Sequence, residues 1–159
     1  MKPLSLCLAI CSIVVFFTAC SKKHNNSPVA QKLHAGIWKI SASKIVNING
    51  IDTVIDRYSN WRPCEQDDIM TFDLDGTMTV NEGADKCGED NQANELSWEL
   101  VDNDTRLRLI LDEGSTFQNG TNTITGEITE LTYNQLVIRA EDVSNSMPVT
   151  TLETYTNIR

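Results

Sequence analysis

From Gly36 onward, apolar and polar side chains alternate along the chain, and no window keeps apolar residues at helical spacing. Alternation with a period of two turns one side of a segment toward a core and the other toward water, which is the pattern of a half-buried β-strand. Strands that follow one another through short turns pair in antiparallel fashion, because parallel pairing needs a long crossover. The sequence therefore predicts an all-β domain over residues 36–159.

The first hairpin of this domain has the clearest turn. Asn49-Gly50 is the dipeptide most typical of a two-residue hairpin, and it joins strands expected at 36–48 and 51–58. Lys44 interrupts the apolar side of the first strand, which indicates either a bulge or a side chain that buries only its stem. The inward residues expected on this strand are Trp38, Ile40, Ala42 and Val46.

Two later hairpins have registers that follow from their turns and their apolar faces. A three-residue turn at 74–76 sets Phe72 opposite Met78, whereas a two-residue turn would put the two apolar faces on opposite sides. The next hairpin sets Trp98 opposite Leu109. The remaining strands are expected at 122–130, 135–141 and 149–157.

A sheet of eight or nine such strands, each following the last, either keeps two exposed edges or closes on itself. Closure removes the unpaired edges, which would otherwise be templates for pairing with other chains. We therefore expect an antiparallel up-and-down β-barrel of eight or nine strands.

A hydrophobic run precedes this domain. Lys2 comes before an apolar stretch over 4–18, which is shorter than the about 20 residues that span a bilayer, and the small residue Ala19 follows. This pattern is typical of a secretory signal over 1–19. Because Cys20 directly follows Ala19, the segment resembles a bacterial lipoprotein signal, which implies cleavage before Cys20 and acylation of its thiol.

The lipoprotein resemblance implies a location and a partner. It places the protein in the envelope of a Gram-negative bacterium, anchored to a membrane by lipid, and Ser21 is similar to the residue found in lipoproteins sorted to the outer membrane. Residues 20–35 are polar, so we expect a flexible tether between Cys20 and the barrel. The net charge of −9 argues against nucleic acid as a partner, because phosphate backbones bind basic faces.

Two cysteines fall within the predicted barrel. Extending the register of the second hairpin places Cys64 opposite Lys86, one residue from Cys87. An even pair of cysteines in an oxidising compartment is typical of a disulfide. The pair lacks the four closely spaced ligands of a thiolate zinc site. We predict a Cys64–Cys87 disulfide and no metal centre.

The start of the first strand adds a family resemblance. Gly36-Ile37-Trp38 is similar to the Gly-x-Trp motif that opens the first strand of lipocalins. Together with the signal, the tether and the meander, it makes residues 33–159 resemble the bacterial lipocalin-like domain lipoproteins. The resemblance implies that Gly36 and Trp38 form a barrel-closing motif, in which the tryptophan packs on a late arginine, here Arg139 or Arg159.

No motif in the chain predicts catalysis. Residues 72–77 reproduce the nucleophile motif of haloacid-dehalogenase-type phosphatases, but Lys86 is the only lysine downstream and a hairpin turn explains the same residues. Both histidines, His24 and His34, precede the barrel, so the barrel has no imidazole for general-base work. The acidic clusters lack the spacing of a calcium loop. We expect no catalytic residue, metal or cofactor, and a protein that is not an enzyme.

The inward face leaves two functions open. Either it lines a cavity for a small hydrophobic ligand, or it fills a solid barrel whose loops dock another component of the cell envelope. An apolar cavity on the order of several hundred Å³ would favour the first function. The residues predicted to line a ligand site are Met70, Phe72, Met78, Trp98, Leu100, Leu107, Leu109 and Ile138.

Overall fold

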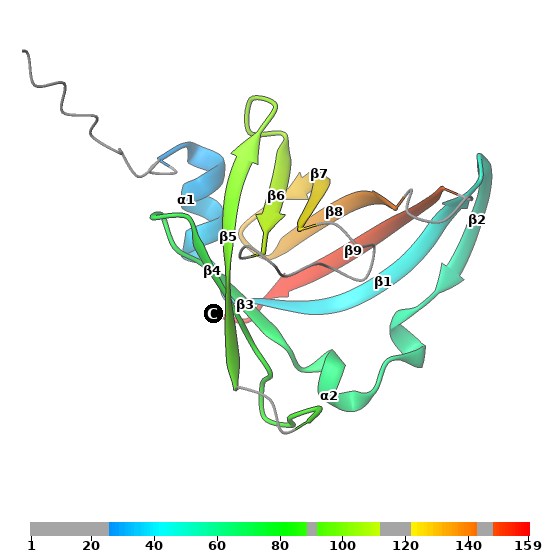
Figure 1. Cartoon of the computed structure of the whole chain (residues 1–159), viewed down its shortest axis with the longest axis horizontal. Helices are drawn as coiled ribbons and strands as arrows, with labels where there is room; N and C mark the ends of the chain where they lie inside the picture. The colour runs from blue at the N-terminus through cyan, green and yellow to red at the C-terminus, as the bar shows by residue number, and fades with distance from the viewer. Residues whose placement is uncertain (1–25, 89–91, 112–121, 143–147) are drawn as a thin grey trace, which may run out of the picture.

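The computed structural model describes residues 26–88, 92–111, 122–142 and 148–159 (Figure 1). Cys20 and the predicted signal therefore lie outside the described residues. In chain order, the elements are α1 (Pro28–Ala35), β1 (Trp38–Ile48), β2 (Ile51–Asp56), η1 (Tyr58–Asn60), α2 (Pro63–Gln66), β3 (Ile69–Phe72), β4 (Thr77–Asn81), β5 (Ala93–Val101), β6 (Arg106–Ile110), β7 (Thr123–Leu131), β8 (Gln135–Asp142) and β9 (Val149–Asn157).

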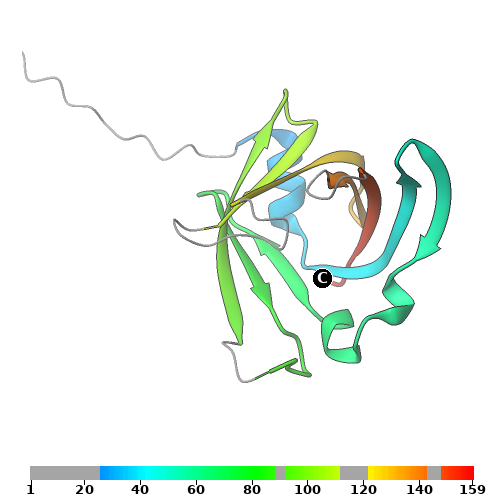
Figure 2. The same ribbon diagram turned by 45° about the vertical axis from the view of Figure 1, so that its right-hand side comes forward.

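The strands form one antiparallel sheet that closes into a barrel. Their order is β2-β1-β3-β4-β5-β6-β7-β8-β9, and β1 also pairs with β9. β2 pairs with β1 along 44–48 and β3 pairs with it at 38–39, so both lie on the same edge of β1. Eight strands thus close the barrel, which confirms the predicted antiparallel barrel of eight or nine strands, and β2 is an additional strand that pairs with β1 outside the closed ring. Figure 2 shows the strands curving around a common interior.

Residues 28–35 form a helix, although the sequence predicted a flexible tether there. The Ser27 hydroxyl accepts the backbone N–H of Ala30 at 3.1 Å, and Pro28 stands in the first turn, where a missing N–H costs nothing. Ala30 and Leu33 are both 0% exposed. The tether prediction is wrong for this segment, because two apolar side chains three residues apart pack the helix against the barrel.

The hairpin registers predicted from the turns are confirmed. Phe72 pairs with Met78, and Trp98 pairs with Leu109. Both central residues of the first turn have positive φ, 51° and 80°, as a two-residue turn of this type requires. Local turn chemistry and alternation therefore determine the pairing along most of the sheet.

The predicted bulge in β1 exists, but it does not lie at Lys44. The register with β9 shifts once at Ser41 and again at Val46. The first shift moves Ser43 to the inside of the barrel, where it is 0% exposed, in place of the expected Ala42. The inner face of β1 is therefore more polar than strict alternation predicts.

The hydrophobic core is concentrated at the end of the barrel where α1 lies. Its largest buried side chains include two tryptophans, a phenylalanine and several aliphatic residues, and less buried apolar side chains continue from it along the barrel axis. We call these two parts of the interior the α1 half and the open half. The core of the α1 half comprises Ala30, Leu33, Trp38, Phe72, Met78, Trp98, Leu100, Leu107 and Leu136. The same buried cluster extends into the open half through Ile40 and Tyr155.

Candidate functional site

The Gly-x-Trp motif lies at the α1 end. Trp38 is fully buried, and its indole Nε1 donates a hydrogen bond to the carbonyl oxygen of Leu33 at 2.8 Å. A Cβ atom on Gly36 would lie 2.5 Å from the Trp38 ring, so only glycine fits there. The motif therefore joins the helix to the first strand and packs the closed end of the barrel.

Of the two candidate arginines, Arg159 lies at this end. Its Nη1 donates to the carbonyl oxygen of Ala35 at 2.9 Å. Arg139 lies on the outer face of β8, in register with Glu127 of β7. The contact that ties a late arginine to the closed end is thus a hydrogen bond from Arg159 to the end of α1.

Five of the eight residues predicted to line a ligand site belong to the packed core. Trp98 is 2% exposed, and its Nε1 donates to the carbonyl oxygens of Asp73 and Thr77, each at 3.0 Å. Its ring meets Phe72 edge-on, with 5.2 Å between the centroids. These contacts give the α1 half a dense, hydrogen-bonded interior. The five residues are Phe72, Met78, Trp98, Leu100 and Leu107.

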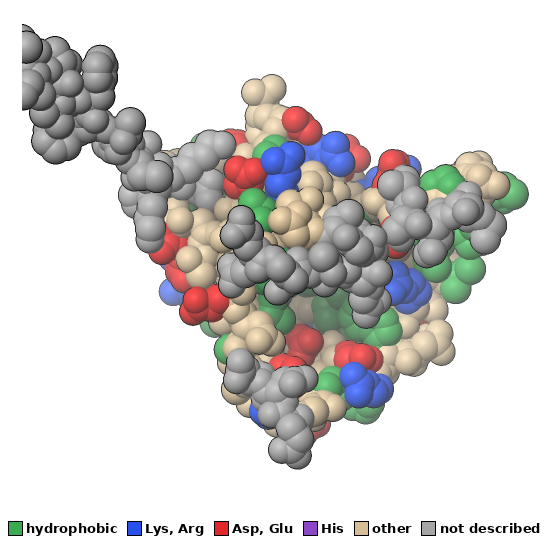
Figure 3. All heavy atoms as spheres, in the orientation of Figure 1, with side chains coloured by type: hydrophobic (Ala, Val, Ile, Leu, Met, Phe, Trp, Pro, Cys, Tyr) green, Lys and Arg blue, Asp and Glu red, His purple; other side chains and the backbone are tan. Residues whose placement is uncertain are grey.

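The other three predicted residues, Met70, Leu109 and Ile138, are only partly buried beside this core. Met70 lines a cavity of about 130 Å³. In Figure 3 the visible face is hollowed at its centre, with hydrophobic side chains in the hollow and acidic side chains at its border. The open half is therefore the accessible part of the interior. The residues that line the cavity are Ile40, Glu65, Asp68, Met70, Val80 and Tyr155.

Asp68 is the most perturbed acid of this cavity. Its Oδ1 has almost no exposed surface and no hydrogen-bond partner among the described residues. Burial, and then the negative charges of Glu82, Asp67 and Glu65, raise the pKa of Asp68 to about 6. The carboxyl group is therefore held where its charge is poorly solvated.

Two further polar groups of the open half lie on neighbouring strands. The Tyr155 hydroxyl donates to Glu153 Oε2 at 2.6 Å, and burial beside that carboxylate raises the pKa of Tyr155 well above its ordinary range. Ser43 of β1 stands in register with Glu153 of β9. The buried hydroxyl of Ser43 has no hydrogen-bond partner among the described residues. This part of the interior thus combines apolar walls with oxygen acceptors.

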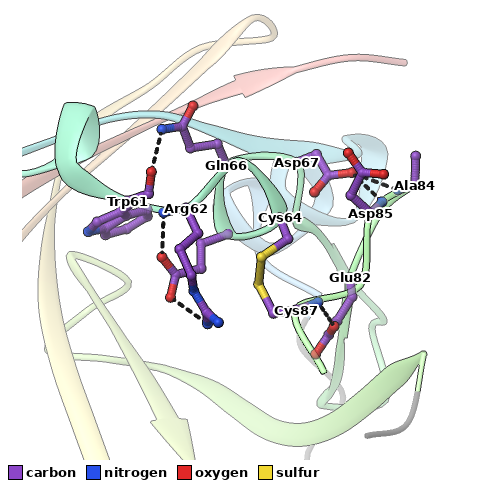
Figure 4. Close-up of a disulfide and its surroundings, with 10 residues drawn as sticks. Trp61, Arg62, Cys64, Gln66, Asp67, Glu82, Ala84, Asp85 and Cys87 are labelled. Atoms are coloured by element: carbon purple, nitrogen blue, oxygen red, sulfur yellow. Dashed lines mark hydrogen bonds and ion pairs between the residues drawn. A yellow bond between two sulfur atoms is a disulfide. The ribbon is translucent and has the colours of Figure 1, made fainter. Parts of the chain in front are cut away.

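A segment between β2 and β3 forms one side of the cavity. We call residues 57–68, which include η1 and α2, the strap. The disulfide between Cys64 and Cys87, with 5.2 Å between the Cα atoms, joins the strap to the loop after β4, and this confirms the predicted bridge. Asp67 Oδ2 also accepts the backbone N–H groups of Ala84 and Asp85, at 2.7 and 3.0 Å, as Figure 4 shows.

Comparison with known proteins identifies the family. The family model described as a lipocalin-like domain matches residues 35–138, which is more than half of the chain. The chain belongs to the lipocalin-like domain family. A lipocalin-like protein from Bacteroides uniformis ATCC 8492 is 14% identical, covers 80% of this chain and 99% of its own, and has a TM-score of 0.47. An uncharacterized protein from Bacteroides eggerthii DSM 20697 is 12% identical, covers 77% and 97%, and has a TM-score of 0.45. No curated protein matches the sequence.

The lipocalin-like barrel has a second, larger hollow on its outer face. This hollow is about 400 Å³ in volume and is bordered by charged side chains of β6, β7 and β8. Arg106 and Glu127 face each other in register there, on the opposite side of the sheet from the buried Leu107. Its polar surroundings fit an apolar ligand poorly, so the interior remains the candidate site.

Sequence reasoning missed the acceptors of the open half. In the sequence, Asp68 belongs to one of the acidic clusters that lack calcium-loop spacing, and Glu153 is distinguished only by having the same parity as Tyr155 in the last strand. The alternation along 149–157 is the signal that could have found Glu153. Within the described ranges, no cluster of three potential metal ligands occurs, and no helix has the length and hydropathy to cross a bilayer.

Proposed function

We propose that this protein is a lipid-anchored lipoprotein of the bacterial cell envelope whose barrel binds a small, largely apolar molecule in its open half. The observation that carries the proposal is the unequal filling of the interior. The α1 half is packed, whereas Met70, Ile40 and Val80 line a cavity of about 130 Å³ in the open half. Members of the lipocalin-like family are typically non-enzymatic binding proteins, which supports this reading.

The size of the cavity limits the ligand. Ligand pockets for drug-sized molecules measure about 300–1,000 Å³, so a cavity of about 130 Å³ takes a short chain or one end of a longer molecule. The same observation favours an alternative function. A barrel that is mostly solid would act as a non-enzymatic interaction protein and dock another envelope component through its loops.

Two substitutions on one strand separate these functions. Leu107 and Leu109 both face inward on β6, but Leu107 is 3% exposed in the α1 half and Leu109 is only partly buried. Leu107→Trp should lose about 1–3 kcal/mol of unfolding free energy by overpacking, and Leu109→Trp should lose less than about 1 kcal/mol. In a binding barrel, Leu109→Trp also reduces saturable uptake of an environment-sensitive apolar dye.

A different pair of results would identify the alternative function, a solid barrel that acts as an interaction protein. A wild-type protein without saturable dye uptake, together with a Leu109→Trp variant as unstable as Leu107→Trp, would indicate a solid barrel. Urea unfolding gives the free energies and fluorescence titration gives the dye binding.

The anchor has a separate test. Cys20→Ala removes the thiol at the proposed cleavage site, so the variant should lose acylation and membrane retention in fractionated bacteria. Cys64→Ser is the matched control, because it removes a cysteine of the folded domain, at the disulfide, and leaves the signal intact. Unchanged membrane retention of the Cys20→Ala protein would contradict the lipoprotein assignment.

A further inference from the structure

We propose that the cavity of the open half selects a cationic amphiphile, a short alkyl chain that carries an ammonium group. This inference rests on the proposed binding function and specifies the chemistry of its ligand. It stands on the cavity itself, which has apolar walls formed by Ile40, Met70 and Val80 and a carboxyl group at Asp68. Glu65 also lines the cavity, but both of its oxygens accept hydrogen bonds from Arg62. The apolar walls fit an alkyl chain, and the Asp68 carboxyl group fits a cation that donates hydrogen bonds.

The charges around the cavity support a cation over an anion. Acidic groups close to Asp68 come from the strap (Glu65 and Asp67) and from the end of β4 (Glu82). Glu153 lies two residues before Tyr155 on β9 and accepts a hydrogen bond from its hydroxyl at 2.6 Å. The attraction between a carboxylate and a positive charge is stronger in a low-dielectric cavity than in bulk water.

The basic groups nearby interact with the neighbouring carboxylates, and among the described residues no cation is seen to stabilise the charge of Asp68. Arg62 pairs with Glu65 at 2.9 Å on the exposed side of the strap. Lys39 interacts with Asp67, whose carboxylate also accepts two backbone N–H groups. Asp68 keeps a buried oxygen with no hydrogen-bond partner among the described residues. Because Asp68 lines the cavity, its carboxylate is the group left to accept hydrogen bonds from an ammonium donor.

The volume of the cavity determines which test ligands are suitable. A cavity of about 130 Å³ holds a six-carbon chain rather than a whole lipid, so hexylammonium, hexanol and hexanoate form a series that differs only in charge. Binding is measured on the full-length mature protein in zwitterionic micelles, from the NMR shift of the Met70 methyl group. At pH 7.5, hexylammonium should bind about tenfold more tightly than hexanoate, with hexanol between them.

A variant and a pH series test the role of Asp68. Asp68→Asn should abolish the preference for hexylammonium over hexanol and leave hexanol binding unchanged. Glu130→Gln is the control, because it removes one charge from an exposed position at the end of β7. In the wild type, the preference for hexylammonium over hexanol should fall between pH 7.5 and pH 5. The reason is that Asp68 takes up a proton near pH 6 while the amine stays charged. This series tests the role of Asp68 even if the variant does not fold.

Each outcome decides a different question. If none of the three probes shifts the Met70 signal, the proposed binding function is wrong. If hexanol and hexanoate bind as tightly as hexylammonium, binding stands and the cationic selectivity is overturned. If the preference survives both Asp68→Asn and acidification to pH 5, Asp68 is not the group that selects the cation.

Discussion

The two halves of the barrel interior differ in how their buried polar groups are satisfied. In the α1 half, the indole N–H groups of Trp38 and Trp98 both donate to backbone carbonyls. In the open half, the hydroxyl of Ser43 and one oxygen of Asp68 have no hydrogen-bond partner among the described residues. Such groups cost stability, and unpartnered buried polar groups are commonly found at functional sites.

The largest expected loss of unfolding free energy comes from a substitution in the packed α1 half. Trp38→Ala removes the largest fully buried side chain and its hydrogen bond to Leu33, so the free energy of unfolding should fall by about 3–5 kcal/mol. Val54→Ala on β2, where the side chain is 75% exposed, should change it by less than about 0.5 kcal/mol. Urea unfolding measures both. Equal, small losses would show that the α1 half is not the stable core.

A smaller effect is expected from the bridge of the open half. Replacing Cys64 and Cys87 together by serine opens a loop with a sequence separation of 23, which should lower the unfolding free energy by about 3 kcal/mol on the chain-entropy model. Hydrogen exchange should quicken in the strap and stay slow around Trp98. Faster exchange throughout the barrel would contradict the division into two halves.

The smallest expected effect is a gain in unfolding free energy, from substitution of Asp68 in the open half. Because the pKa of Asp68 is raised from its ordinary 3.8 to about 6, the unfolded chain ionises first, and the wild type loses stability as pH rises from about 4 to above 6. Asp68→Asn avoids this loss. At pH 7.5 it should be more stable than the wild type by about 1 kcal/mol, once solvent screening is allowed for, and at pH 3.5 the two should be alike.

The matched control for this pH dependence is again Glu130→Gln, which removes an exposed charge. Thermal or urea unfolding at the two pH values measures the difference between the variants. A stabilisation by Asp68→Asn that is the same at pH 3.5 and pH 7.5 would show that the Asp68 charge is not its cause.

Local signals predicted most of the fold because they determine it locally. The turns at 49–50 and 74–76 each select one register. The predicted disulfide forms, but not by extension of the second register, because that ladder ends at Ile69 and Asn81 and Cys64 lies in α2. The Gly-x-Trp motif predicted the closed end for a steric reason, since the Trp38 ring occupies the space of a side chain at Gly36.

The features that sequence reasoning missed depend on tertiary contacts. Alternation shows that a residue points inward, but it does not show how far along the barrel axis the interior is filled, so Trp98 and Met70 looked alike. The bulge at Ser41 has no distinctive residue, and it changes which side chain of β1 is buried. The helix 28–35 had a local signal in Ser27 and Pro28, but its stability comes from packing on the barrel.

The unequal filling of the interior is the central claim, and two methionines report on it directly. Met70 lies in the open half and lines the cavity, whereas Met78 is 1% exposed in the packed half. Xenon enters apolar cavities of this size, so NMR of methyl-labelled methionine under xenon pressure probes each half. Unequal filling of the interior predicts a saturable shift of the Met70 signal and an unchanged Met78 signal. A Met78 shift as large as that of Met70, or no shift of either signal, would contradict it.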